Sequence, residues 1–175
     1  DLLKNKTKSS QNRLSTRFEE LDRVLGGGLV SGEVILFSGE PGVGKSTLLN
    51  QIAVKMASRK SVLYVSGEES LSQINGRIDR LFGGDLGVNA KEKLMISTDI
   101  EVEKLAKLID DEDFDLIIVD SIQSLRSLSS KAYPGSISQV RKCGQLLNSV
   151  AKRNNVPMFI VGQINKEGSI AGPKV

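Results

Sequence analysis

The sequence predicts an α/β fold in which an open, mainly parallel β-sheet carries helices on both faces. Short apolar runs without polar alternation are typical of strands buried on both faces, and they alternate along the chain with longer amphipathic stretches typical of helices. This alternation favours βαβ units, whose strands are parallel. The predicted strands are 34–38, 61–66, 94–97, 116–120 and 157–162.

The helices are predicted from apolar residues that recur at helical spacing. The first such stretch lies between Leu14 and Leu25, and we expect a helix that begins near Ser15 or Thr16 and ends at the glycines 26–28. The residues between the strand that ends at Asp120 and the last helix are loop-like over 124–136. The later predicted helices are 45–58, 71–81, 101–110 and 137–154.

Length and composition predict one globular domain. The chain has 175 residues, 39% hydrophobic and 26% charged. Residues 1–12 are polar and are expected to form a flexible arm or linker, and 13–175 the domain. No apolar run is long enough to span a bilayer. The single cysteine, Cys143, favours a reducing, cytoplasmic setting and is expected to pack in a helix, while the lack of histidine excludes histidine-based catalysis and metal sites.

The stretch GEPGVGKS follows the first predicted strand and precedes a predicted helix. In this context the pattern GxxxxGK[ST] indicates a phosphate-binding loop, and a plain glycine turn is the alternative. Glycines let backbone N–H groups turn inward around an anion, and the helix N-terminus adds partial positive charge. Lys45 is expected to reach the outer phosphates and the Ser46 hydroxyl to bind Mg²⁺. The predicted ATP/ADP-binding residues are Gly39, Glu40, Pro41, Gly42, Val43, Gly44, Lys45, Ser46 and Thr47.

Polar residues follow several predicted strands, at the end where open α/β sheets bind ligands. Asp120 is predicted to hold Mg²⁺ opposite the phosphate loop, and a helix cap or a solvated strand end is the alternative. Glu68 is predicted to orient the attacking water; Glu69 is the second choice, and either could instead complement a helix dipole. Gln163 is predicted to sense the γ-phosphate, with a surface amide as the alternative. The predicted catalytic residues are Lys45, Glu68, Glu69 and Gln163, and the predicted metal ligands are Ser46 and Asp120.

The net charge of +3 hides an uneven distribution of charge along the chain. Residues 126–175 hold eight Lys or Arg against Glu167 alone, whereas 18–125 is acidic. A basic block favours a polyanionic partner, although solubilising lysines would give the same composition. Isolated cations in Gly/Ser-rich loops suit contacts to a nucleic-acid backbone. The predicted DNA-binding residues are Arg126, Lys131, Lys166 and Lys174.

Five strings of the sequence, taken together, are similar to a known family. They are ELDRVLGGGLVSGEVILFSGEPGVGKSTLL, VLYVSGEES, IIVDSIQS, YPGSISQVRK and VGQINKEGSIAGPKV. They resemble the bacterial RadA (Sms) family of RecA-superfamily ATPases over about residues 13–175. The KaiC ATPases are similar in the first three strings and diverge in the last two.

This resemblance implies a RecA-like P-loop core and a homohexameric ring. It implies ATP hydrolysis coupled to single-stranded or branched DNA, with branch migration during recombination and repair. It places the magnesium carboxylate at Asp120 and the catalytic carboxylate at Glu68. It also implies that Ser124–Ser136 and Ile164–Val175 face DNA, and it makes the recombinase RecA a candidate partner.

The chain also departs from the family pattern. Family members begin with a four-cysteine zinc module, so zinc is expected only there, and continue into a KNRFG motif and a Lon-like domain. Gln163 stands where many relatives have histidine, and Arg17 where many have glycine. We interpret the chain as an ATPase core whose site is completed by basic residues of a neighbouring subunit. The alternatives are a nucleotide-switched DNA-binding module with negligible turnover, a KaiC-like signalling ATPase and, least favoured, a P-loop kinase.

Overall fold

A parallel sheet forms the centre of the molecule, whose computed structural model describes residues 13–83 and 87–163. Within these ranges the sheet has five strands in the order β1-β5-β4-β2-β3, and every neighbouring pair is parallel. The α/β fold class predicted from the sequence is confirmed. The strands are β1 (Val34–Gly39), β2 (Val62–Ser66), β3 (Leu94–Ser97), β4 (Leu116–Asp120) and β5 (Met158–Gln163).

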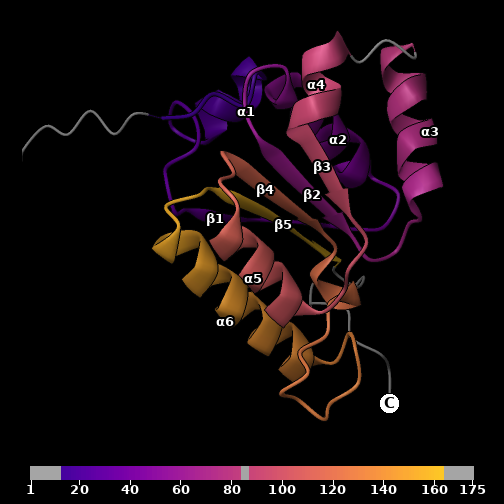
Figure 1. Ribbon diagram of the computed structural model, residues 1–175, viewed down its shortest axis with the longest axis vertical. Coiled ribbons are helices and arrows are strands. Elements are labelled where there is room, and N and C mark those ends of the chain that lie inside the picture. The colour runs from indigo at the N-terminus through magenta and orange to yellow at the C-terminus, as the bar shows by residue number, and fades with distance from the viewer. Residues whose placement is uncertain (1–12, 84–86, 164–175) are drawn as a thin grey trace, which may run out of the picture.

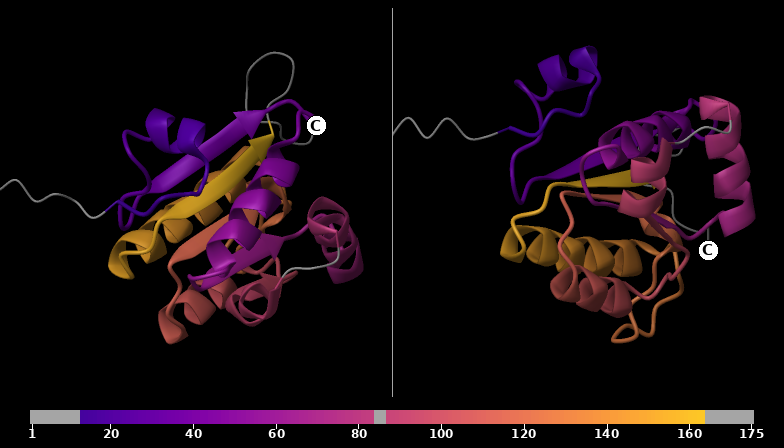
Figure 2. Two further views of the ribbon diagram at one scale, coloured as in Figure 1. Left: turned by 90° about the horizontal axis from the view of Figure 1, so that it is seen from above. Right: turned by 45° about the horizontal axis from the view of Figure 1, so that its top comes forward.

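Helices cover the two faces of the sheet in separate layers (Figure 1). On one face, α5 (Val102–Asp111) lies beside α6 (Ile137–Arg153). On the other face, α2 (Lys45–Ala57) packs with α4 (Gly87–Lys93), and α3 (Leu71–Phe82) packs against α2 near β3 (Figure 2). Both faces are covered, and β2 and β4 are accordingly buried throughout and carry a polar residue only at their last position, Ser66 and Asp120.

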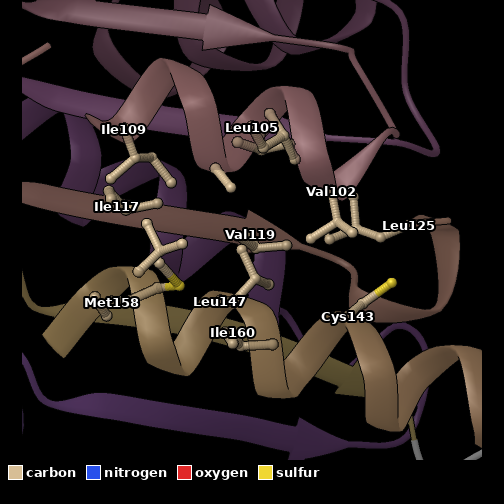
Figure 3. Close-up of a cluster of buried hydrophobic side chains, with 14 of the residues drawn as sticks. Val102, Leu105, Ile109, Ile117, Val119, Leu125, Cys143, Leu147, Met158 and Ile160 are labelled. Carbon is tan, nitrogen blue, oxygen red and sulfur yellow. The ribbon is translucent and has the colours of Figure 1, made fainter. Parts of the chain in front are cut away.

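One hydrophobic core fills the space between the sheet and the α5–α6 layer (Figure 3). Leu105 and Ile109 of α5 pack with Ile117 and Val119 of β4, and Leu147 of α6 belongs to the same cluster. A second core lies between the opposite face and α2. These two layers fix the strands, so the residues at the carboxyl ends of the strands are positioned by a rigid framework.

The first helix begins later than the sequence predicts. α1 spans Glu19–Val24, whereas a start near Ser15 or Thr16 was expected, and that prediction is wrong. The Asp22 carboxylate accepts hydrogen bonds from the Ser15 hydroxyl at 2.6 Å and from both the amide and the hydroxyl of Thr16 at 2.8 Å. These side-chain bonds compete with helix formation, and Arg17 takes a left-handed φ of 68°.

The sequence predicts no helix at 87–93, where the structure contains α4. Of the apolar residues in this segment, Ala90 is buried and Val88 is exposed, so no helical periodicity reveals it. The other α-helices and the strands begin and end within one residue of the predicted bounds, and a short 3₁₀-helix that was not predicted, Ile122–Ser124, follows β4. No helix in the described ranges is long and apolar enough to cross a membrane. The predicted arm, 1–12, lies outside the described residues.

Candidate active site

Four strands end beside one cavity of about 300 Å³. β5 lies between β1 and β4, and the strand register places Gln163 opposite Gly39 and Asp120 opposite Ser66. The cavity therefore receives residues from the glycine-rich loop and from the ends of β2, β4 and β5. Its lining residues are Pro41, Gly42, Gly44, Lys45, Ser46, Thr47, Glu68, Arg77, Asp120, Val161 and Gln163.

The glycine-rich loop has the conformation that an anion-binding loop requires. Gly42 and Gly44 have φ values of 83° and 94°, in the left-handed region where a side chain would be strained. α2 begins directly after this loop, so the free N–H groups of its first turn lie at the cavity. The Lys45 ammonium donates hydrogen bonds to the carbonyl oxygens of Gly39 at 2.8 Å and Glu40 at 2.7 Å. An ionised phosphate oxygen is a stronger acceptor than either carbonyl.

A chain of buried hydrogen bonds connects Asp120 with the start of α2. The Tyr64 hydroxyl donates to Oδ2 of Asp120 at 2.8 Å and accepts a hydrogen bond from the Asn50 side-chain amide at 3.1 Å. The same amide donates to the carbonyl oxygen of Ser46 at 2.6 Å. Burial, followed by the charge of Asp120, raises the pKa of Tyr64 far above its ordinary value, so the hydroxyl remains a donor. The Asp120 carboxylate is thereby fixed relative to the helix that carries Ser46.

The side-chain oxygens of Ser46 and Asp120 suit Mg²⁺, a hard cation that prefers oxygen ligands. Tyr64 holds one carboxylate oxygen of Asp120, and the other, Oδ1, accepts no hydrogen bond from the described residues. Over those same ranges, no group of three or more His, Cys, Asp or Glu side chains could hold a metal on its own. A magnesium ion bound here would therefore take further ligands from phosphate and water, as Mg²⁺ commonly does.

The Glu68 carboxylate lies at the cavity in a network of neutral side chains. The Ser121 hydroxyl donates to its Oε1 at 2.6 Å, and the Gln163 side-chain amide donates to Oε1 and Oε2 at 3.1 and 3.2 Å. The side chain of Gln123 then pairs with the backbone of Gln163, donating to its carbonyl oxygen and accepting from its N–H. Glu68 and Gln163, predicted separately from the sequence, are thus in direct contact.

Glu69 is not part of this network and does not line the cavity. It forms a two-point ion pair with Arg77 of α3: Nη1 donates to Oε1 at 3.0 Å, and Nη2 donates to Oε2. The next residue, Ser70, caps α3 by accepting a hydrogen bond from the amide of Gln73. Of the two adjacent carboxylates, the geometry favours Glu68 as the one that meets a ligand in the cavity.

Of the predicted DNA-binding residues, the two that the structure describes, Arg126 and Lys131, do not line the cavity. The Arg126 guanidinium forms an ion pair with Glu101 at 2.5 Å, and Lys131 is exposed in the loop before α6. Lys166 and Lys174 lie outside the described residues. Contact with DNA remains a prediction for all four cations.

Several side chains at the site carry no sequence signal strong enough to predict them. A tyrosine in an apolar strand and an asparagine in a helix are ordinary, and only their burial reveals that they must be hydrogen-bonded. Ser121 directly follows Asp120, which places it at the strand end but does not show that it contacts Glu68. Arg77 lies in the middle of an amphipathic helix with no local pattern. The unpredicted residues are Asn50, Tyr64, Arg77 and Ser121.

The parallel sheet, the glycine-rich loop after β1 and the carboxylate at the end of β4 define a RecA-like P-loop protein. A crystal structure of the RadB recombinase superposes with a TM-score of 0.60 at 26% identity, covering 86% of this chain and 70% of that one. A KaiC-like protein from Pyrococcus horikoshii superposes with a TM-score of 0.72 at 22% identity, covering 90% of this chain and 73% of that one, a likeness that shows the fold.

Residues 3–169 match the family model described as "AAA domain", and the chain belongs to that family. It is 49% identical over 168 residues to the DNA repair protein RadA of Aquifex aeolicus, covering 96% of this chain and 36% of that protein. It is 43% identical over 168 residues to the DNA repair protein RadA of Bacillus subtilis, covering 95% of this chain and 35% of that protein. The predicted resemblance to RadA is confirmed. The chain spans about a third of the length of these relatives.

Proposed function

We propose that this chain is the ATP-hydrolysing core of a DNA-dependent ATPase that acts in recombination and DNA repair. The observation that carries the proposal is the meeting of Lys45, Asp120 and Glu68 at one cavity, because a P-loop, a magnesium-binding carboxylate and a water-orienting carboxylate are the parts that phosphoryl transfer to water requires. The similarity to RadA proteins supports the role in repair.

Each side chain has a distinct role in the proposed hydrolysis. Lys45 exchanges its two carbonyl partners for oxygens of the outer phosphates. Ser46 and Asp120 hold Mg²⁺, which neutralises charge on the phosphates when it is bound. The Glu68 carboxylate accepts a hydrogen bond from the attacking water and aligns it with the terminal phosphorus. Gln163 keeps Glu68 in place and connects it to the end of β5.

The whole protein is proposed to work as a cytoplasmic homohexameric ring. In this arrangement a neighbouring subunit supplies basic residues to the site, and the ring moves on single-stranded or branched DNA to drive branch migration, with RecA as a candidate partner. The support for this part is the similarity to RadA and to a solved RadB recombinase. Arg126 and Lys131 are the proposed DNA contacts among the described residues.

Exchange of Lys45 for alanine in the full-length protein tests the proposal. We expect loss of ATP turnover, measured as phosphate release with Mg²⁺ and single-stranded DNA, whereas Lys91→Ala, an exposed lysine of α4, should leave turnover unchanged. Wild-type turnover in the Lys45→Ala protein would exclude this site as the place of hydrolysis. Transfer of the phosphoryl group to a copurified metabolite, without release of inorganic phosphate, would indicate a kinase.

A second function, a nucleotide-switched DNA-binding module with negligible turnover, is favoured by one observation. In the described ranges, Lys45 and Arg77 are the cations that line the cavity, and Arg77 is already paired with Glu69. An arginine supplied to the transferred phosphate is worth about 10³–10⁵ in rate. Turnover of the full-length protein, measured with and without DNA, separates the two functions. Either function requires DNA affinity to fall as salt rises.

A further inference from the structure

Arg77 lines the phosphate-loop cavity, although the glycine-rich loop and the strand ends already account for the proposed hydrolysis. Its side chain is 16% exposed and reaches the cavity from α3, an element that contributes no other lining residue. Its charge also acts on Tyr64, whose pKa it lowers in opposition to burial and Asp120. Arg77 also lines the same cavity as Asp120, the proposed magnesium-binding carboxylate.

The hydrogen bonds of this guanidinium are incompletely satisfied. Both Nη atoms donate to Glu69, but Nε is buried and has no partner among the described residues. A buried donor without an acceptor is costly in free energy, and an arginine fork matches the oxygens of phosphate as well as those of a carboxylate. A buried, partly satisfied guanidinium beside a phosphate-binding loop is suited to bind phosphate oxygens.

Glu69, the carboxylate paired with Arg77, lies where it can compete with a bound phosphate. It is adjacent to Glu68 in sequence but does not line the cavity, and its side chain is 32% exposed. A carboxylate at that position neutralises Arg77 when no anion is present. It also competes with an incoming phosphate for the same donors, since both are ionised oxygen acceptors.

We propose that Arg77 binds the terminal phosphate of a nucleoside triphosphate from within the same chain, and that Glu69 is the counter-ion it leaves to do so. This inference rests on the proposed function, because it assumes that the cavity receives a triphosphate. Arg77 on α3 would then distinguish a nucleoside triphosphate from a diphosphate, because only the triphosphate carries the terminal phosphate. A basic residue from a neighbouring subunit would then add to an arginine already present at the site.

The test measures the affinities of the full-length protein for AMP-PNP and for ADP, with Mg²⁺, by titration calorimetry. We expect Arg77→Gln to weaken AMP-PNP binding by about 10–100-fold and to leave ADP binding within about threefold, because only AMP-PNP carries the terminal phosphate. Arg77→Lys should recover part of the loss. Glu69→Gln should have the opposite effect and raise the affinity for AMP-PNP relative to that for ADP several-fold. Arg80→Gln is the matched control on the same helix, since Arg80 does not line the cavity.

A purely structural ion pair gives a different pattern, in which Arg77→Gln and Glu69→Gln affect both nucleotides alike or neither, and that pattern overturns the inference. Unchanged ADP binding shows that a variant is folded. If Arg77→Gln does not fold, the test rests on Glu69→Gln. In that case, an affinity for AMP-PNP relative to ADP that does not rise in Glu69→Gln overturns the inference. Failure of the wild-type protein to bind AMP-PNP would overturn the proposed function as well, whereas wild-type binding with an unaltered preference in the variants overturns only the role of Arg77.

Discussion

The Tyr64 hydroxyl donates a hydrogen bond of 2.8 Å to the Asp120 carboxylate, and so links two neighbouring strands at the candidate magnesium site. It also accepts a hydrogen bond from Asn50, whose amide holds the carbonyl oxygen of Ser46. One tyrosine thus connects the proposed magnesium-binding carboxylate with the helix that follows the glycine-rich loop. A residue in this position sets the distance between the two proposed protein ligands of the metal.

Removal of the Tyr64 hydroxyl should weaken the response of the protein to Mg²⁺. In Tyr64→Phe, Asp120 loses its partner, so we expect the Mg²⁺ concentration for half-maximal ATP turnover to rise several-fold. Stability should fall by about 1–3 kcal/mol because the Asn50 amide loses an acceptor. Tyr133→Phe, at an exposed tyrosine, is the control. A lower melting temperature with an unchanged Mg²⁺ requirement would show that Tyr64 is only structural.

Asp22 should make stability depend on pH at the acidic end. Burial acts to raise the pKa of Asp22, but hydrogen bonds from Ser15 and Thr16 outweigh it, and the folded-state pKa lies below the ordinary value of 3.8. Its contribution is therefore present above pH 3.8 and is lost as the pH falls through the lowered pKa. Asp22→Asn should cost about 1–2 kcal/mol at neutral pH and less in acid. Urea unfolding at several pH values measures this, with Glu19→Gln as the exposed control.

The left-handed backbone at Arg17 should favour glycine over alanine. Arg17 has a φ of 68°, a conformation that strains any residue with a Cβ. Arg17→Gly and Arg17→Ala both remove the charge, but only alanine keeps the strain. We expect the glycine variant to be more stable than the alanine variant by about 1 kcal/mol in urea unfolding. Equal stability of the two variants would contradict this account of the turn.

Cys143 should react only when the protein opens. The residue is fully buried in α6, and burial raises the pKa of its thiol to about 11. Burial keeps reagents away from the sulfur, and the raised pKa lowers the fraction of thiolate, which is the reactive form. Modification by a thiol reagent at neutral pH should therefore follow the rate of opening, and become rapid in denaturant. Fast stoichiometric labelling of the folded protein would show that α6 is not packed as described.

The sequence predicts the backbone of the site better than its side-chain network. The phosphate loop and Asp120 were predictable because each follows an apolar strand, and parallel strands end at the same edge. The bond between Glu68 and Gln163 joins residues 95 positions apart, and that between Tyr64 and Asp120 joins residues 56 apart. Such contacts depend on strand order, which the pattern of apolar residues does not determine.

The errors at α1 and α4 have a related cause. At α1 the apolar spacing was helical, but side-chain bonds to Asp22 formed a turn instead. At α4 a helix exists with Ala90 as its only buried residue, so tertiary packing stabilises a segment without amphipathic spacing. In both places the outcome was decided by contacts with the rest of the fold and not by local periodicity.

The position of β5 between β1 and β4 has a mechanical consequence. Gln163 ends this strand, which pairs with β1 along its whole length and with β4 over residues 158–160, and Gly39 lies opposite Gln163 in the register. A force along the chain at Gln163 would shear the hydrogen bonds of β5 with β1 and with β4 simultaneously. It would not break these bonds one after another. The strand is thus anchored to the phosphate-loop strand on one side and the Asp120 strand on the other. A displacement of Gln163 would also act on Glu68, because the Glu68 carboxylate is bonded to the Gln163 side chain.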